Sequence, residues 1–458
     1  MASRGASVLD LDRVWALKTA EDERFVAERP RSAQLLARGR AWMREGVPNV
    51  WFWSNYDHPP VYVEQGNGAY FTDVDGHRYL DMMLGISCAF CGHAPGPVAE
   101  AIARQARRGS AFQLPVEDAI WVADELSRRF APLRWQFALS SSQAITDCIR
   151  LARAHTHRQK VLKFDANYHG HVDQTLVILE DGQVKHEYRG LPEESLRRTK
   201  VIQFNDAAAL EAALAGRDVA CVITEPAMTN IGFVLPQPGY HEALRRITRE
   251  TGTLLLIDET QTVMCGHGGL TREYGLEPDL FVVGKSIGGG VPFAAYGINQ
   301  AVASQIEAPR AAYNVSGAAV DEVATGGTMW ANAISVAAAR SVLEHLLTDQ
   351  AYAHARLLGS RLAHGIQETI ADAGLPWSTF HFYTKSGFTF SPALPANAEE
   401  ARAADILGVK DALNVYFANR GIWDGGWWAG PAVSIAHTED HIDHYVHVFG
   451  EFLREVVT

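Results

Sequence analysis

The segment DLFVVGKSIGGGVPFAAYG at residues 279–297 decides the expected fold. It holds the apolar run LFVVG at 280–284 and all but the last residue of the run FAAYGI at 293–298, on either side of Lys285-Ser286 and three glycines. Short runs of this kind are typical of strands buried on both faces of a sheet. Similar runs come earlier in the chain: WQFAL at 135–139, KVLKF at 160–164, VACVIT at 219–224 and LLLID at 254–258. Helical stretches lie between several of these runs, so the pattern predicts an α/β domain with a mostly parallel sheet.

The chain on either side of this block predicts a smaller α+β lobe. GAYFTDVDGHRYLDMM at 68–83 has two strand-like runs around Asp75-Gly76, a hairpin turn pair. Helices are expected near 332–347 and 352–374, with strands around 379–391 and 430–436. We therefore expect an N-terminal segment at 1–95, a large ligand-binding domain at 96–335 and a C-terminal segment at 336–458. Both chain ends would build the small lobe.

Composition restricts the classes of partner. The chain has 458 residues, 47% of them hydrophobic, which is enough for two lobes. Its formal net charge is −12 and it has no basic stripe, which argues against nucleic acid or an anionic membrane as partner. No apolar run is long enough to span a bilayer, and the N-terminus lacks the apolar core of a signal peptide. We expect a soluble, cytoplasmic protein.

Polar residues that directly follow the apolar runs are the first candidates for a site, because ligands bind beyond the carboxyl ends of the strands in such a sheet. The run at 135–139 leads into Ser140-Ser141-Ser142 and a helix, whose free N–H groups would form a phosphate cradle. An ordinary serine N-cap is the alternative. Tyr168 follows the run at 160–164, and its ring would either lie on a bound heterocycle or belong to the core.

Two charged residues follow later strands. A carboxylate such as Asp258, at the end of a buried strand, is costly unless it meets a cation, and a pyridinium N–H would be such a partner. An aspartate that caps the next loop is the alternative. Lys285, one of only eight lysines, follows an apolar strand directly, so desolvation would make it a usable nucleophile. A surface lysine is the alternative there.

Taken together, these residues supply the parts of a site for pyridoxal 5′-phosphate (PLP). They are a phosphate cradle, an aromatic ring to stack on the cofactor, a carboxylate for the ring nitrogen and an imine-forming lysine. Gly326-Gly327-Thr328, before the helix near 332, adds a second possible phosphate contact. No metal is expected, because His169 and His171 are not spaced like a helical pair of ligands.

The order of the motifs resembles the class III PLP aminotransferases, in the branch that holds glutamate-1-semialdehyde aminomutase and D-phenylglycine aminotransferase. The matching segments extend from about residue 45 to the C-terminus and include ALSSSQAITDCIRLARAHT (138–156), FDANYHGHVD (164–173), TEPAMTNIGFVLP (224–236), IDETQT (257–262), the opening segment, GGTMWANAISVAA (326–338) and VSIAHTEDHID (433–443). This resemblance implies the PLP-dependent transferase fold of type I. That fold has a mostly parallel seven-stranded sheet flanked by helices in the PLP-binding domain.

The resemblance also implies the catalytic residue and two of its neighbours. Lys285 would hold the cofactor as a Schiff base and move the proton. Asp258 would pair with the pyridine nitrogen, and Tyr168 would stack on the ring.

The remaining cofactor contacts are carried over in the same way. Ser141 and Ser142 would bind the phosphate, and Asn230 and Gln261 match positions near the phenolic oxygen of the cofactor. Thr328 would reach the phosphate in the site of the neighbouring subunit, which implies a homodimer with shared active sites.

The chain departs from the family pattern at two places that matter. Ser141-Ser142 replaces a Gly-Thr of the phosphate loop, and the backbone amides survive that change. In REGVPNVWFW at 44–53, Val50, Trp51, Phe52 and Trp53 stand near the point where relatives of this branch carry an arginine that grips a substrate carboxylate. Trp51 and Trp53 suggest an apolar or aromatic substrate pocket instead, with core or dimer interface as the alternative.

These observations predict a PLP-dependent transaminase that moves an amino group from a small-molecule donor to an oxo acceptor. An aminomutase or amino-acid racemase, which applies the same proton chemistry to one substrate, is the alternative. A non-catalytic relative that binds a phosphorylated ligand is a third hypothesis. Without an acceptor, a transaminase would stop after one turnover, and this separates the first two hypotheses.

Overall fold

The chain forms two compact units in a computed structural model that describes residues 9–50, 58–306, 323–406, 408–424 and 430–458. Unit 1 consists of Met1–Pro95, Gln350–Leu394 and Ala403–Thr458, and unit 2 consists of Gly96–Asp349 and Pro395–Arg402. The boundary expected at residue 335 falls inside helix α12 (Ala333–His345), which belongs to unit 2. The assignment of domains to functions stays a prediction.

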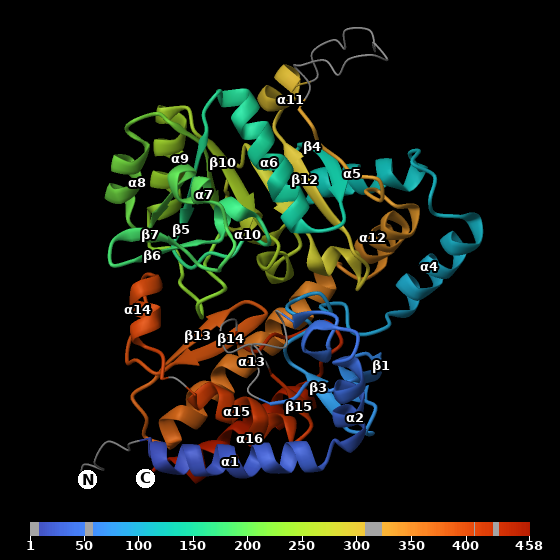
Figure 1. The fold of residues 1–458 in the computed structure, drawn as a ribbon, viewed down its shortest axis with the longest axis vertical. Helices are drawn as coiled ribbons and strands as arrows, with labels where there is room; N and C mark the ends of the chain where they lie inside the picture. The colour runs from blue at the N-terminus through green and yellow to red at the C-terminus, as the bar shows by residue number, and fades with distance from the viewer. Residues whose placement is uncertain (1–8, 51–57, 307–322, 407, 425–429) are drawn as a thin grey trace. The chain divides into compact units, whose positions relative to one another are not determined.

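A seven-stranded sheet forms the centre of unit 2 (Figure 1). Its strands, in spatial order, are β4 (Arg134–Ala138), β12 (Ala294–Ile298), β11 (Leu280–Val283), β10 (Leu254–Asp258), β9 (Val219–Thr224), β5 (Lys160–Phe164) and β8 (Thr199–Ile202). Strand β12 is antiparallel to both of its neighbours, and all other neighbouring pairs are parallel. The predicted α/β fold with a mostly parallel seven-stranded sheet is confirmed.

The strands match the apolar runs where burial is complete. Every residue of β9, β10, β11 and β12 is buried, and such strands need residues that are apolar or whose polar groups are compensated. Strand β8 is not among the predicted strands. Its sequence TKVI alternates between buried and partly buried positions at the edge of the sheet, so it contains no continuous apolar run.

Helices pack against this sheet and against one another. They are α4 (Gly96–Arg108), α5 (Glu117–Arg129), α6 (Ser141–Thr156), α7 (Glu193–Arg198), α8 (Ala207–Leu214), α9 (Tyr240–Thr251), α10 (Gly269–Glu273), α11 (Gln300–Ile306) and α12, with a small hairpin of β6 (Val177–Glu180) and β7 (Gln183–His186). Helix α6 contacts β4, β9, β11 and β12. Its buried residues Ile145, Cys148 and Ile149 join the sheet residues in one apolar core. Packing on this face therefore places the N-terminus of α6 at the edge where the parallel strands end.

Unit 1 is built from both ends of the chain. Its elements are α1 (Leu11–Ala27), α2 (Pro30–Gly39), β1 (Val63–Asn67), β2 (Tyr70–Asp73), β3 (Arg78–Asp81), α13 (Asp349–Asp372), β13 (Ser378–Phe382), β14 (Lys385–Thr389), α15 (Val409–Ala418), β15 (Ile422–Trp423) and α16 (Glu439–Val456), with α14 (Ala398–Ala403) at the boundary to unit 2. The predicted hairpin around Asp75-Gly76 is present as β2 and β3.

The prediction of a strand around 430–436 is wrong. In this described stretch only Ala432 forms an isolated bridge, to Lys385. The backbone N–H and the hydroxyl of Ser434 both bond to Nδ1 of His437, each at 2.8 Å. Such local side-chain bonds favour a turn over a strand.

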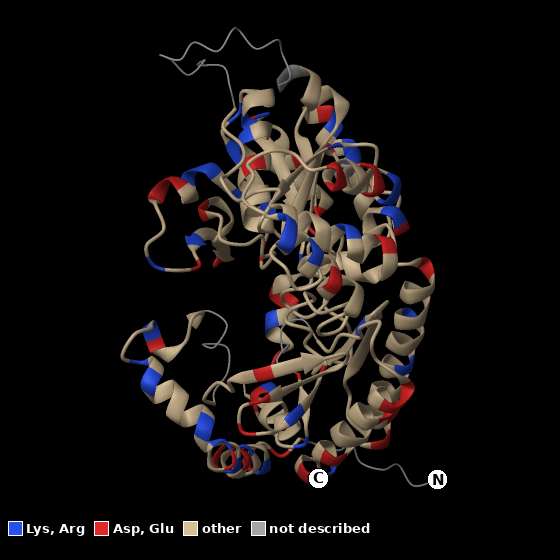
Figure 2. Ribbon diagram, turned by 90° about the vertical axis from the view of Figure 1, so that its right-hand side faces the viewer, with Lys and Arg blue, Asp and Glu red and all other residues tan. Residues whose placement is uncertain are grey.

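Charged residues lie mainly outside the central sheet. Figure 2 shows acidic and basic residues spread over helices and loops with both signs mixed. Within the part of the chain that the structure describes, no helix combines the length and the apolar composition needed to cross a bilayer.

Gly359 in α13 tests the packing of unit 1. A Cβ atom there would lie 2.0 Å from the carbonyl oxygen of Tyr383, which follows β13. Because backbone cannot yield as a flexible side chain can, we expect Gly359→Ala to lower the free energy of unfolding by about 1–3 kcal/mol. Urea denaturation measures this. Leu357→Ala, at a residue 65% exposed on the same helix, should cost under about 0.5 kcal/mol. Equal stability of the two variants would contradict this packing.

Candidate functional site

The predicted site residues that can be placed all belong to unit 2. Five of them follow the carboxyl ends of strands: Ser141 and Ser142 after β4, Tyr168 after β5, Asp258 at the end of β10 and Lys285 after β11. Because β4, β5, β10 and β11 run in the same direction, these ends meet at one edge of the sheet. Trp51 and Trp53 lie outside the described residues.

Lys285 opens a short 3-10 helix, Lys285–Gly288, in an unusual backbone conformation. Its φ angle is 51°, in the left-handed region that residues with a side chain rarely occupy. Such a conformation costs about 1–3 kcal/mol and persists where the surroundings impose it, often at functional sites. A Cβ atom at the preceding Gly284 would lie 2.4 Å from Oγ of Ser141. The hydroxyl of Ser141 therefore lies against the backbone next to Lys285.

The three serines have different positions: the first is the N-cap of α6, and the other two begin the helix. Ser140 is the N-cap of α6, and its Oγ accepts a hydrogen bond from the N–H of Gln143. Ser141 and Ser142 occupy the first turn, whose N–H groups have no acceptor within the helix. The N–H of His171 donates to Oγ of Ser142 at 3.0 Å, so the loop after β5 packs on this helix end. The arrangement can bind an anion such as phosphate.

Asp258 is a buried carboxylate that keeps its negative charge. Nδ1–H of His169 donates to its Oδ2 at 2.9 Å, and the backbone N–H of Thr260 donates to its Oδ1 at 3.0 Å. Burial raises the pKa of Asp258, but the hydrogen bonds from His169 and Thr260 and the charge of His169 outweigh burial and hold the pKa below its usual value. The bond from Thr260 also makes Asp258 a loop cap, as the alternative proposed.

Two further predicted residues line the same edge. Tyr168 directly precedes His169 and is partly buried. Burial, with minor contributions from Tyr188 and Glu187, raises the pKa of Tyr168 to about 12, so the phenol stays protonated and presents a neutral ring. Gln261 is buried and follows Asp258 by three positions.

Asn230 and Thr328 have different surroundings. The side-chain amide of Asn230 donates to Oε1 of Glu225 and to Oγ1 of Thr229, each at 3.3 Å. Thr328 is exposed in the single chain. Its loop is held on α6, because the N–H of Gly326 donates to Oδ2 of Asp147 at 3.0 Å.

Three residues beside the site have structural roles that the sequence did not predict. His169 is the hydrogen-bond partner of Asp258, whereas its sequence pattern raised only the question of a metal ligand. Glu225 follows β9 directly and could have been found by the rule that selects Asp258. Asp147 is an acidic residue on the otherwise apolar face of α6, which is a weaker signal.

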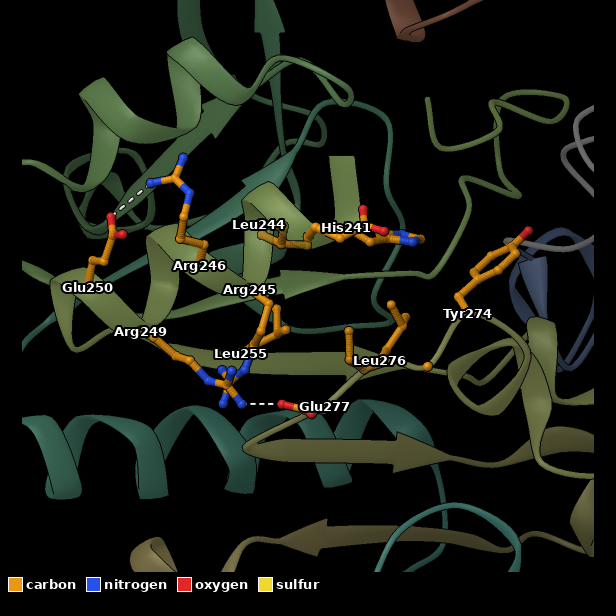
Figure 3. A pocket seen from close by; sticks show the side chains of 13 residues that line it. His241, Leu244, Arg245, Arg246, Arg249, Glu250, Leu255, Tyr274, Leu276 and Glu277 are labelled. Carbon is orange, nitrogen blue, oxygen red and sulfur yellow. Dashed lines mark hydrogen bonds and ion pairs between the residues drawn. The ribbon is translucent and has the colours of Figure 1, made fainter. Parts of the chain in front are cut away.

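Within the described ranges, no group of three or more histidine, cysteine, aspartate or glutamate side chains is arranged to hold a metal ion. A pocket of about 540 Å³ lies elsewhere in unit 2, between α9 and residues 274–277 (Figure 3). None of its lining residues is a predicted site residue. Its three arginines already pair with carboxylates: Arg245 with Asp279, Arg246 with Glu250 and Arg249 with Glu277. The pocket therefore offers no unpaired arginine to a ligand.

Comparison with known proteins gives consistent matches over most of the chain. A family model described as Aminotransferase class-III matches residues 52–373. A glutamate-1-semialdehyde 2,1-aminomutase from Akkermansia muciniphila is 32% identical over 429 residues, which cover 91% of this chain and 97% of the relative. The crystal structure of a glutamate-1-semialdehyde-aminomutase from Pseudomonas aeruginosa is 38% identical, with a TM-score of 0.92 and coverage of 98% of this chain and 99% of that chain. A variant of that protein was solved in complex with PMP. An omega-transaminase structure from Sphaerobacter thermophilus is 27% identical, with a TM-score of 0.83 and coverage of 93% and 97%.

Gly170 and Gly182 form a matched pair that tests the phosphate cradle. Both have positive φ, 78° and 72°, but a Cβ atom at Gly170 would lie 2.1 Å from Oγ of Ser142, whereas nothing lies within 4 Å at Gly182. Gly170→Ala must push the loop off α6, and we expect the affinity for PLP to fall by about tenfold or more, a loss of at least 1.4 kcal/mol. Gly182→Ala should cost about 1 kcal/mol of stability from backbone strain and leave the affinity unchanged. Cofactor titration and thermal melts measure both, and parallel losses of affinity would argue against the cradle.

Proposed function

Because this chain belongs to the class-III aminotransferase family and is therefore a PLP enzyme, we propose that it moves an amino group between neighbouring carbons of one small substrate, as an aminomutase. The observation that carries this proposal is the similarity to two proteins named as aminomutases, over more than nine tenths of each chain. From the sequence alone, a transaminase is the first hypothesis and an aminomutase is the second. The comparisons favour the second, and membership in an enzyme family removes support from the non-catalytic hypothesis.

The residues at the strand ends fit the cofactor. Asp258 is an anion at a buried position, as a protonated ring nitrogen requires, and a Cβ at Gly170 would fill space beside the first turn of α6. When bound, PLP supplies an electron sink that stabilises the carbanion formed when a proton leaves the carbon that bears the amino group.

Three side chains would perform the work around the reacting atoms. Lys285 would hold the cofactor through Nζ and, once released by the substrate, carry a proton between carbon atoms. Asp258 would keep the ring nitrogen protonated, with His169 restraining its carboxylate. Tyr168 would lie against the ring.

The other contacts would position the cofactor. Ser141 and Ser142 would bind the phosphate through the first turn of α6. Asn230 and Gln261 would lie near the phenolic oxygen.

Thr328 would complete the phosphate site of a second subunit. This proposal of a homodimer is supported by the exposure of Thr328 and by exposed apolar residues on nearby segments, Phe112, Leu114 and Met329. The side chain of Asn332 donates to the carbonyl of Ser110, which brings these segments together.

A transaminase with an apolar or aromatic substrate is the second candidate. Its support is the sequence at 50–53, where Val-Trp-Phe-Trp stands in place of a carboxylate-binding arginine, and the similarity to an omega-transaminase. The decisive experiment offers the purified enzyme glutamate-1-semialdehyde alone, and then a panel of amines and amino acids with and without an oxo acceptor. Continuous turnover of one substrate without an acceptor supports the aminomutase. Turnover that needs an acceptor overturns it in favour of the transaminase.

Lys285→Ala tests the catalytic lysine. We expect this variant to fold, to bind PLP without a covalent link and to lose turnover by at least about 100-fold. Lys160→Ala is the control, because Lys160 lies at the amino end of β5 and pairs with Asp218. Borohydride reduction followed by peptide mapping should place the cofactor on residue 285 of the parent and the control. A label on another lysine would reject the assignment.

Asp258→Asn tests the buried anion. The amide keeps the size of the side chain but cannot hold a proton on the ring nitrogen, so we expect turnover to fall by about 100-fold or more. Thermal melts of the variant check that folding is kept. A variant with full activity would show that the ring nitrogen needs no anion in this enzyme.

A further inference from the structure

A second buried carboxyl group lies beside the candidate site and has no part in the function proposed above. Glu225 follows β9, is 2% exposed, and accepts hydrogen bonds from three side chains. The amide of Asn167 donates to Oε1 at 2.6 Å, the amide of Asn230 donates to the same oxygen at 3.3 Å, and the hydroxyl of Thr229 donates to Oε2. We call these four residues the Glu225 cluster.

The Glu225 cluster joins two loops that carry residues of the candidate site. Asn167 directly precedes Tyr168 in the loop after β5. Asn230 lies in the loop after β9, which is closed by two backbone hydrogen bonds between Met228 and Val234, at 3.1 and 3.2 Å. One carboxyl group therefore restrains both loops from a third position, the end of β9.

Two of the three donors depend on Glu225 because they are themselves buried. Thr229 is fully buried and Asn167 is 2% exposed, so water cannot replace a lost acceptor. Oδ1 of Asn167 is buried and has no hydrogen-bond partner within the described residues. The side chain of Asn167 is therefore held by the bond from its amide nitrogen to Glu225. A buried donor without an acceptor costs about 1–3 kcal/mol, enough to make a loop rearrange.

The buried surroundings of Glu225 disfavour the ionised form of its carboxyl group. Burial raises the pKa of Glu225, although the charge of His169 and the bonds from Thr229 and Asn167 lower it in part. The three donors offset part of the cost of burying the group. Glu225 thus accepts hydrogen bonds from three side chains, which an apolar residue of the same size could not do.

We propose that Glu225 is a positioning residue that fixes Tyr168 and Asn230 relative to each other around the cofactor. The inference rests on the proposed function, in which these two side chains contact PLP. Glu225 itself acts through Asn167, Thr229 and Asn230.

Glu225→Leu and Glu225→Gln separate positioning from simple stability. Leucine keeps the volume but accepts no hydrogen bond, so both loops lose their common acceptor. Glutamine keeps an oxygen for the two asparagine amides, and its own amide can donate to the hydroxyl of Thr229. We expect the leucine variant to bind PLP about tenfold more weakly or worse. Its visible circular dichroism per bound cofactor should also change, because that signal reports how the ring is held. The glutamine variant should restore both.

Glu259 provides the matched control. It is also fully buried, and it accepts hydrogen bonds from the side chains of Thr262 and Thr271, which carry no predicted cofactor contact. Glu259→Leu should lower the melting temperature as Glu225→Leu does and leave the visible dichroism per bound PLP unchanged.

The outcomes distinguish the two proposals. Parent enzyme without a visible PLP band, or without a borohydride adduct, overturns the proposed function itself. Parent enzyme with normal PLP binding, combined with a leucine variant at 225 whose affinity and dichroism equal those of the parent, overturns only the positioning role of Glu225. A dichroism change in the Glu259 variant as large as in the Glu225 variant would also overturn it, because the effect would then follow from destabilisation alone.

Discussion

A buried carboxylate at the end of a strand is the constraint on which this site depends. Asp258 stays ionised among apolar strands because His169 and Thr260 donate hydrogen bonds to it. His169 comes from the loop after β5, so the charge on one strand end dictates the shape of the loop on another. Tyr168, the residue before this histidine, takes its place from the same interaction. The hydrogen bond that compensates the charge of Asp258 therefore also restrains the backbone next to Tyr168.

Close approach between loops is the second constraint. The backbone at Gly170 and Gly284 passes so near to Ser142 and Ser141 that a methyl group has no room. These contacts pull three strand ends toward the start of α6. The N-terminus of α6 and the lysine that follows β11 are thereby neighbours, although about 140 residues separate them in sequence.

The sequence predicted the parts that burial determines, and it missed the parts that tertiary contacts determine. The bounds of β5, β9 and β10 equal those of the apolar runs, because each residue in a doubly covered strand must be apolar or compensated. The edge strand β8 lacks that requirement and went unpredicted, and local bonds between Ser434 and His437 prevented the strand expected there. Residues directly after strands could be named from sequence. The links among Asn167, Glu225 and Asn230 could not, because they depend on how separate loops fold back.

The division of the chain has a consequence for the order in which the protein folds during synthesis. All seven strands of the central sheet lie between Arg134 and Ile298, so the ribosome delivers that sheet in one continuous stretch. Unit 1 needs its first 95 residues and the last segment of the chain, from Ala403 to Thr458. Its N-terminal helices must therefore wait, with apolar faces uncovered, until the segment from Ala403 to Thr458 has been synthesised. Domains usually fold as units in the order of synthesis, and here the N-terminal unit finishes last. Helix α1 therefore remains without its packing partners α15 and α16 for longer than the strands of the central sheet remain without theirs.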